Sequence, residues 1–196
     1  ETYTEEQIGN ITGDEEVQIT PEKSEGTGIT DIKIKTKSDI QNAKITISKL
    51  DEKPETVLSD AGEYTYMYLD ITLKSDDTDV DDADIDSLTV TFKVAQDWFD
   101  TNNIDKNKVT LLRYHNNEWQ RLSTTMTSED SSFVYFEATT AGLSTFAITG
   151  EQVVDETPEP TGGVPWIFII VGIIAAIVVA VLVLVKSGYL YFDHEE

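Results

Sequence analysis

The chain has 196 residues and a formal net charge of −23 at pH 7, with 37 acidic residues against 14 basic ones. So acidic a surface repels nucleic acid and anionic lipid headgroups, and we expect neither as a partner. The chain contains no cysteine, which excludes disulfides, thiolate catalysis and cysteine-ligated metals.

Residues 1–27 are acidic, rich in turn residues and weakly periodic. We interpret them as a lead-in segment or linker, with room for one short strand at 16–20. The chain begins with Glu1, which indicates either a removed signal peptide or the C-terminal piece of a longer protein. The triplet Asn10-Ile11-Thr12 is a sequon, which makes Asn10 a glycosylation candidate and favours an extracellular N-terminal side.

Residues 28–150 contain short runs of alternating apolar and polar residues, the pattern of half-buried strands. Such runs cover 32–35, 43–48, 67–73, 88–94, 132–138 and 144–149. Two more, 109–114 and 118–122, flank a predicted hairpin turn at 115–117, and 95–102 is the single helical candidate. We therefore predict an all-β ectodomain, an antiparallel Ig-like β-sandwich, where Ig-like describes the architecture alone.

Several motifs in this region, taken in order, resemble the PGF-pre-PGF domain of archaeal cell-surface proteins. They are SLTVTFKV at 87–94, QDWF at 96–99, NID at 103–105, VTLLRY at 109–114, WQRL at 119–122 and TTAGLSTFAITG at 139–150. The resemblance implies a β-rich, membrane-proximal module near the C-terminus of exported proteins, some of them S-layer associated. It carries over no catalytic residue. The Pro-Gly-Phe that names the module is Ala141-Gly142-Leu143 here.

The stretch 75–86 (SDDTDVDDADID) has carboxylates at alternate positions, as calcium loops do. It lacks the glycine and the closing glutamate of an EF-hand, and charge runs are usually solvated. We favour a solvated loop and expect no cofactor, with Ca²⁺ as the alternative. The candidate ligands are Asp77, Asp79, Asp81, Asp82, Asp84 and Asp86.

Large aromatic residues are the other candidate binding feature. Trp98, Phe99 and Trp119 could form a sugar-binding platform, but core packing is the stronger interpretation because a small β domain needs their burial. Tyr64, Tyr66 and Tyr68 predict a stripe on one face of a strand, either an interaction face or a half-exposed sheet surface. With two histidines and no nucleophile, metalloprotease or phosphate-loop motif, we predict that the protein is not an enzyme and has no catalytic residues.

Residues 151–165 form an acidic Pro/Gly stalk, and residues 166–185 are twenty apolar residues without a charge. A helix of that length covers about 30 Å, the thickness of a bilayer core, so we predict a transmembrane helix over 166–186 and a short cytoplasmic tail over 187–196. Lys186, the only basic residue near the helix, places the C-terminus in the cytoplasm by the positive-inside rule. Predicted interface anchors are Trp166, Lys186, Tyr189 and Tyr191.

Within this apolar run, small residues recur at every fourth position, a spacing that lets two helices approach closely. They are Gly172, Ala176 and Ala180. The expected function is a single-pass archaeal surface protein whose sandwich and helix anchor a surface layer, appendage or larger ectodomain. Its expected partners are the bilayer and other cell-surface or membrane proteins. The alternatives are an accessory subunit held through a helix-mediated oligomer, and a surface module that binds Ca²⁺ or glycans.

Overall fold

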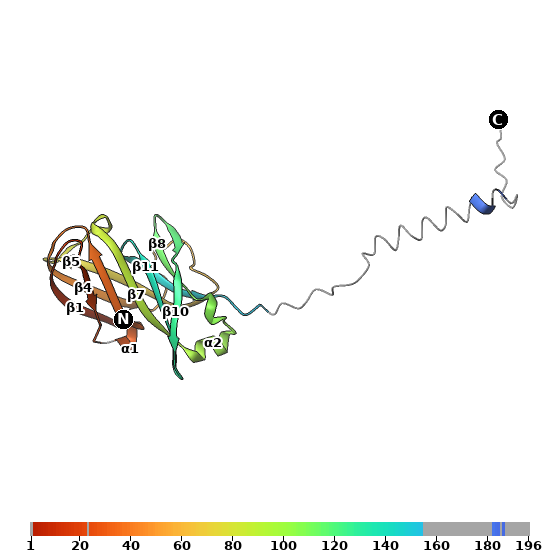
Figure 1. Cartoon of the computed structure of the whole chain (residues 1–196), viewed down its shortest axis with the longest axis horizontal. Coiled ribbons are helices and arrows are strands. Elements are labelled where there is room, and N and C mark those ends of the chain that lie inside the picture. Colours follow the sequence, from red (N-terminus) through yellow and green to blue (C-terminus); the bar gives the residue numbers. More distant parts are fainter. Residues whose placement is uncertain (1, 23, 155–181, 185, 187–196) are drawn as a thin grey trace, which may run out of the picture. The chain divides into compact units, whose positions relative to one another are not determined.

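A computed structural model of the chain describes residues 2–22, 24–154, 182–184 and 186. The chain divides into two units, Glu1–Val153 and Val154–Glu196. In the first unit two antiparallel sheets pack face to face, with two short helices, α1 (Ser24–Thr27) and α2 (Gln96–Asn102), at the periphery (Figure 1). The prediction of an antiparallel β-sandwich is confirmed at this level.

The first sheet has the strand order β1-β4-β5-β12-β8-β9, with the two-residue β6 added beside β5. Every pairing in it is antiparallel. Its strands are β1 (Thr2–Ile11), β4 (Ile40–Leu50), β5 (Tyr64–Ser75), β6 (Thr78–Asp79), β8 (Thr110–His115), β9 (Glu118–Arg121) and β12 (Ser144–Gly150).

The second sheet has the order β10-β11-β7-β3-β2 and is also antiparallel throughout. Its strands are β2 (Glu16–Ile19), β3 (Ile29–Thr36), β7 (Ile85–Ala95), β10 (Thr124–Glu129) and β11 (Phe133–Thr140). Two single 3₁₀ turns, η1 (Asp82–Asp84) and η2 (Lys106–Lys108), lie in the connections before β7 and β8.

The core lies between the sheets, and the alternation in the sequence places it there. In β7 the residues Leu88, Val90, Phe92 and Val94 are all at most 1% exposed, whereas the threonines and the lysine between them are half-buried. Side chains alternate between the faces of a strand, so one face of each sheet supplies apolar surface to the other. Phe92 and Phe136 stack at the centre, with ring centroids 5.5 Å apart.

The predicted boundary at residue 27 is wrong. Residues 2–11 form β1, which pairs with β4 along its whole length, and Ile11 is 1% exposed. The short strand expected at 16–20 is β2, at the edge of the second sheet. The sandwich therefore starts at the first described residue, because both sheets take an edge strand from the segment expected to be a linker.

The hairpin and the helix expected from the sequence are both present. β8 and β9 are joined through Asn116 and Asn117, whose φ angles of 53° and 64° are those of a tight hairpin turn. The helix expected at 95–102 is α2, which ends at the left-handed Asn103.

None of the helices in the described residues has the length and apolarity that crossing a membrane requires. The predicted transmembrane helix at 166–186 lies outside the described residues except for 182–184 and 186, which are helical.

Candidate functional site

The acidic stretch 75–86 does not form a single pocket of carboxylates. Asp77 pairs with Lys44 at 3.3 Å, Asp79 with Lys74 at 3.6 Å, and Asp86 with Lys35 at 3.1 Å. These lysines lie on three different strands, so the carboxylates are drawn in different directions. In the part of the chain that the structure describes, no three acidic or histidine side chains are grouped so that they could hold a metal ion. The Ca²⁺ alternative thus gains no support from the described residues and stays a prediction.

Two aspartates of this stretch organise the loop itself. The carboxylate of Asp81 accepts a hydrogen bond of 2.8 Å from the backbone N–H of Ala83 and so caps η1. Asp82 is partly exposed and forms an ion pair with Arg113 of β8. Its other oxygen accepts a hydrogen bond of 2.7 Å from the backbone N–H of Leu143. One carboxylate thereby joins η1, β8 and the turn that precedes β12.

Arg113 is an unusual residue for its position because its side chain is only 7% exposed. It lies opposite Phe146, whose side chain is in the core, so the register of β8 and β12 directs Arg113 to the inner face. Its Nε has no hydrogen-bond partner among the described residues, and His115 lies 3.4 Å from its Nη2. A buried guanidinium needs a partner charge, and Asp82 supplies it.

Gly142 makes this arrangement possible. A Cβ at this position would contact the Nη2 of Arg113 and lie 2.7 Å from the Oδ1 of Asp82. Any side chain at this position would have to displace the ends of the Arg113 and Asp82 side chains from their ion pair. We name Asp82, Arg113, Gly142 and Leu143 the ion-pair end of the sandwich.

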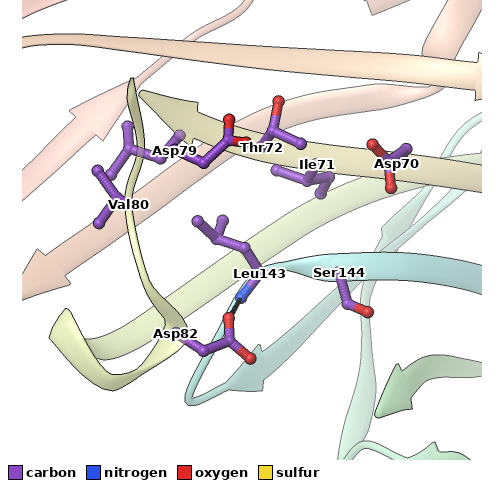
Figure 2. Close-up of a pocket in the computed structure, with 9 residues that line it drawn as sticks. Asp70, Ile71, Thr72, Asp79, Val80, Asp82, Leu143 and Ser144 are labelled. Carbon is purple, nitrogen blue, oxygen red and sulfur yellow. Dashed lines mark hydrogen bonds between the residues drawn. The ribbon is translucent and has the colours of Figure 1, made fainter. Parts of the chain in front are cut away.

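A cavity of about 170 Å³ opens beside the ion-pair end (Figure 2). It lies at a gap in the strand pairing along β5. The pairing with β12 ends at Ile71, and the pairing with β6 begins only at Lys74. Asp70, Asp79 and Asp82 contribute its carboxylates, together with apolar residues. Partial burial raises the pKa of Asp70, and a hydrogen bond from the Thr145 hydroxyl opposes that rise.

The predicted aromatic residues separate into two groups. Phe99 is 3% exposed and belongs to the core, and Trp98 packs edge-on against it with ring centroids 5.4 Å apart. Trp119 lies instead against Tyr114, at 5.2 Å between centroids. Its indole N–H donates a 2.9 Å hydrogen bond to the carbonyl of Ser59, in the 51–63 loop. Phe99 is therefore part of the core and Trp98 packs against it, as predicted. Trp119 lies outside the core, where the 51–63 loop contacts it.

The tyrosine stripe expected on β5 is broken by a β-bulge. The pairing of β5 with β12 shifts between Met67 and Thr65, which leaves Tyr66 as the extra residue. Tyr66 then reaches the other sheet: its hydroxyl accepts a 3.3 Å hydrogen bond from the N–H of Ala95, and its ring packs against Trp98 at 5.2 Å. Tyr68 keeps the opposite face and contacts Trp119. The sequence pattern could not show this change of side because it assumes an unbroken strand.

The C-terminal end of β12 carries a second set of contacts that the sequence did not predict. The carbonyl of Asn103 accepts a 2.8 Å hydrogen bond from the N–H of Val153, and the N–H of Asp105 donates a 2.9 Å bond to the carbonyl of Glu151. Between them, Ile104 forms an antiparallel bridge with Gln152. We name residues 102–105 and 151–153 the exit clamp, because the chain leaves the sandwich there.

Side chains reinforce the exit clamp. The Gln152 amide donates a 3.0 Å hydrogen bond to the carbonyl of Asn102, and Arg121 pairs with Glu151 at 3.0 Å. Ile104 is 5% exposed, and together with Trp98 it presses on Gly150, where an added Cβ would lie 2.5 Å from Ile104. The N-terminal part of the predicted stalk is thus fixed to the sandwich.

The remaining predicted site residues fall in three places. Asn10 is exposed on β1, and its Oδ1 accepts a 3.1 Å hydrogen bond from the N–H of Asn42. Asp84 belongs to η1, and Lys186 is exposed in a helical segment. The others lie outside the described residues: Trp166, Gly172, Ala176, Ala180, Tyr189 and Tyr191.

Comparisons with known proteins bring no assignment to this chain. No family model matches it, and no curated protein matches it.

Proposed function

We propose that the chain is a single-pass membrane protein whose β-sandwich is a membrane-proximal module on the outer side of the cell membrane. The observation that carries this proposal is the run of twenty uncharged residues at 166–185, which is long enough to span a bilayer. In this proposal the module couples a surface layer, an appendage or a larger ectodomain to the membrane. The resemblance to the PGF-pre-PGF domain supports an archaeal surface location.

The exit clamp supports an anchoring role. A module that transmits force to a membrane helix needs the chain to leave its fold through a segment that does not peel away easily. Backbone hydrogen bonds on both sides of Gln152 hold residues 151–153 to the α2–η2 connection, and the Arg121–Glu151 pair holds them to β9. Several bonds in one short segment must break together before β12 can be pulled out of the sheet.

The charge of the chain supports display away from the headgroups. A net charge of −23 repels anionic lipid, so the sandwich is expected to stay off the membrane surface rather than lie on it. In the sequence, the acidic residues 151–165 lie between the sandwich and the apolar run. We also propose that the module is not an enzyme and binds through its surface.

Extraction of the full chain from vesicles tests the proposal. We expect the protein to stay with the lipid in alkaline carbonate, and the double variant Ile174→Lys/Val178→Lys to be released, because each charge at the centre of a span costs about 3 kcal/mol. The matched control, Val153→Lys/Val154→Lys, adds the same charges near the start of the stalk, outside the apolar run, and should stay with the lipid. Release of the unaltered chain would overturn membrane anchoring.

A further inference from the structure

Four strands end the two sheets, and three of them are protected against pairing with another chain. β2 and β9 have only four residues each, and each begins with a glutamate, Glu16 in β2 and Glu118 in β9. β1 is longer, but it carries Glu5 and Glu6 in mid-strand and its pairing shifts at Gly9. Short length, charge and irregularity are the usual devices that keep an edge strand from adding a partner.

The fourth edge, β10, lacks most of this protection. Its sequence is TTMTSE, five of its six residues are exposed, and its only partner strand among the described residues is β11. Glu129 is its one charge, and Lys106 neutralises that charge at 2.6 Å. A bulge at Thr127 interrupts the pairing with β11 once, and Thr124–Met126 stays in regular register.

The sequence of β10 is compatible with itself in antiparallel pairing. In an antiparallel register centred on Thr125, Thr125 lies opposite itself and Thr124 opposite Met126, and Glu129 does not meet the Glu129 of the second strand. Cross-strand threonine pairs stabilise a sheet, whereas like charges directly opposite would destabilise it. On a chain with a net charge of −23, an edge whose single carboxylate is paired with a lysine lets two copies approach with less repulsion than the glutamates of β1 would.

We propose that β10 is a self-association edge, at which a second copy of the chain pairs antiparallel with β10 so that the two five-stranded sheets become one continuous sheet. The contact is isologous, because the same strand serves both partners, and it closes as a dimer. One strand buries little area, so the association is weak and depends on local concentration. Salt strengthens it, because about 1 M salt shortens the screening length to about 3 Å and removes the repulsion between the two acidic bodies.

Cysteine cross-linking of the full chain tests this proposal, since the chain has no native cysteine. We compare Thr125→Cys, on β10, with Thr56→Cys, in an exposed loop, both in the same detergent under mild oxidation. Any pairing of the apolar C-terminal segments contributes equally to both. We expect the Thr125→Cys chain to form disulfide dimers about tenfold faster, because pairing raises the effective concentration of the two thiols.

A second substitution distinguishes strand pairing from random collision. Adding Thr127→Lys to the Thr125→Cys chain places a like charge on each partner's edge and should bring the rate down to that of Thr56→Cys. The same lysine added to Thr56→Cys should change its rate little. Equal rates for the two single-cysteine chains overturn the proposal, and so does fast linking that the lysine leaves unchanged. A Thr125→Cys rate below the control would mean that another part of the same chain covers β10, and would also overturn it.

Discussion

The two ends of β12 are closed by different chemistry. At the Ser144 end, a buried arginine and one carboxylate join η1, β8 and the turn before β12, and a glycine leaves room for them. At the Gly150 end, Trp98 of α2 and Ile104, two residues after the helix ends, pack against the strand, and backbone hydrogen bonds fix the departing chain. The first end therefore depends on a few charged atoms, whereas the second depends on many small contacts.

This difference predicts different responses to substitution. A buried ion pair fails when either partner is removed, because the remaining charge is left without compensation. An end held by packing and backbone bonds loses stability in proportion to the volume or the contacts that change.

Removal of Asp82 should have the largest effect. Asp82→Ala leaves the Arg113 guanidinium buried without a carboxylate, and we expect a loss of about 2–4 kcal/mol in the free energy of unfolding. Asp79→Ala is the matched control, because that carboxylate is 79% exposed in its pair with Lys74, and such pairs contribute about 0–1 kcal/mol. Urea unfolding of the two variants measures the difference.

The double variant Asp82→Ala/Arg113→Met identifies the cause. When the arginine is also replaced by an apolar residue of similar length, no buried charge remains, so the double variant should be more stable than Asp82→Ala alone. If the double variant is the less stable of the two, then loop contacts of Asp82, and not the buried charge, account for its contribution.

Gly150→Ala tests the other end and should cost about 1–3 kcal/mol, because the new methyl group lies 2.5 Å from Ile104 and 2.8 Å from Trp98. Gly62→Ala is the control: its nearest contacts are at 3.6 Å or beyond, so it should be neutral or slightly stabilising. Thermal unfolding of both variants measures the contrast. An equal change in both would show that α2 yields to the methyl group without strain.

Most of the sandwich could be predicted from alternation, and the exceptions have physical causes. β7 reads as a strand because its inward residues are all apolar. β1 buries only Thr4 and Ile11 fully, and its pairing shifts at Gly9, so it shows no clear period. β10 has no buried residue, since it lies at an edge and its side chains face solvent. Edge strands of this kind are defined by their neighbours rather than by their own sequence.

The ion-pair end and the exit clamp could be predicted much less well. Arg113 did carry a signal, because it follows Val109 and Leu111 at alternate positions and so falls on the apolar face of β8. Nothing in the sequence indicates that Asp82 is its partner, because Asp82 is 31 residues away and is one of several similar aspartates. The exit clamp consists largely of backbone hydrogen bonds between segments about 50 residues apart, which side-chain patterns do not encode.

The smallest effect concerns pH, and it has opposite signs at the two ends. Asp70 lines the cavity at the ion-pair end, and partial burial raises its pKa above the ordinary 3.8. Asp130 lies at the α2 end, where the N–H groups of Ser132 and Phe133 and the Tyr135 hydroxyl lower its pKa. A raised carboxyl pKa means that the folded state holds its proton more tightly than the unfolded state does, and a lowered pKa means the reverse.

The contribution of Asp70 is present below its ordinary pKa and is lost as pH rises through the folded value, so Asp70→Asn should stabilise the protein at pH 7 and lose that advantage below about pH 4. The contribution of Asp130 is present above its ordinary pKa and is lost as pH falls through the folded value, so Asp130→Asn should destabilise the protein at pH 7 and differ less from the parent chain in acid. Unfolding midpoints of the parent chain and the two variants, measured between pH 3 and 7, test this. The midpoints of the two variants should lie on opposite sides of the parent's at neutral pH and move toward it in acid. If the two variants lay on the same side at neutral pH, burial at one end and hydrogen bonding at the other could not be the causes of the two pKa shifts.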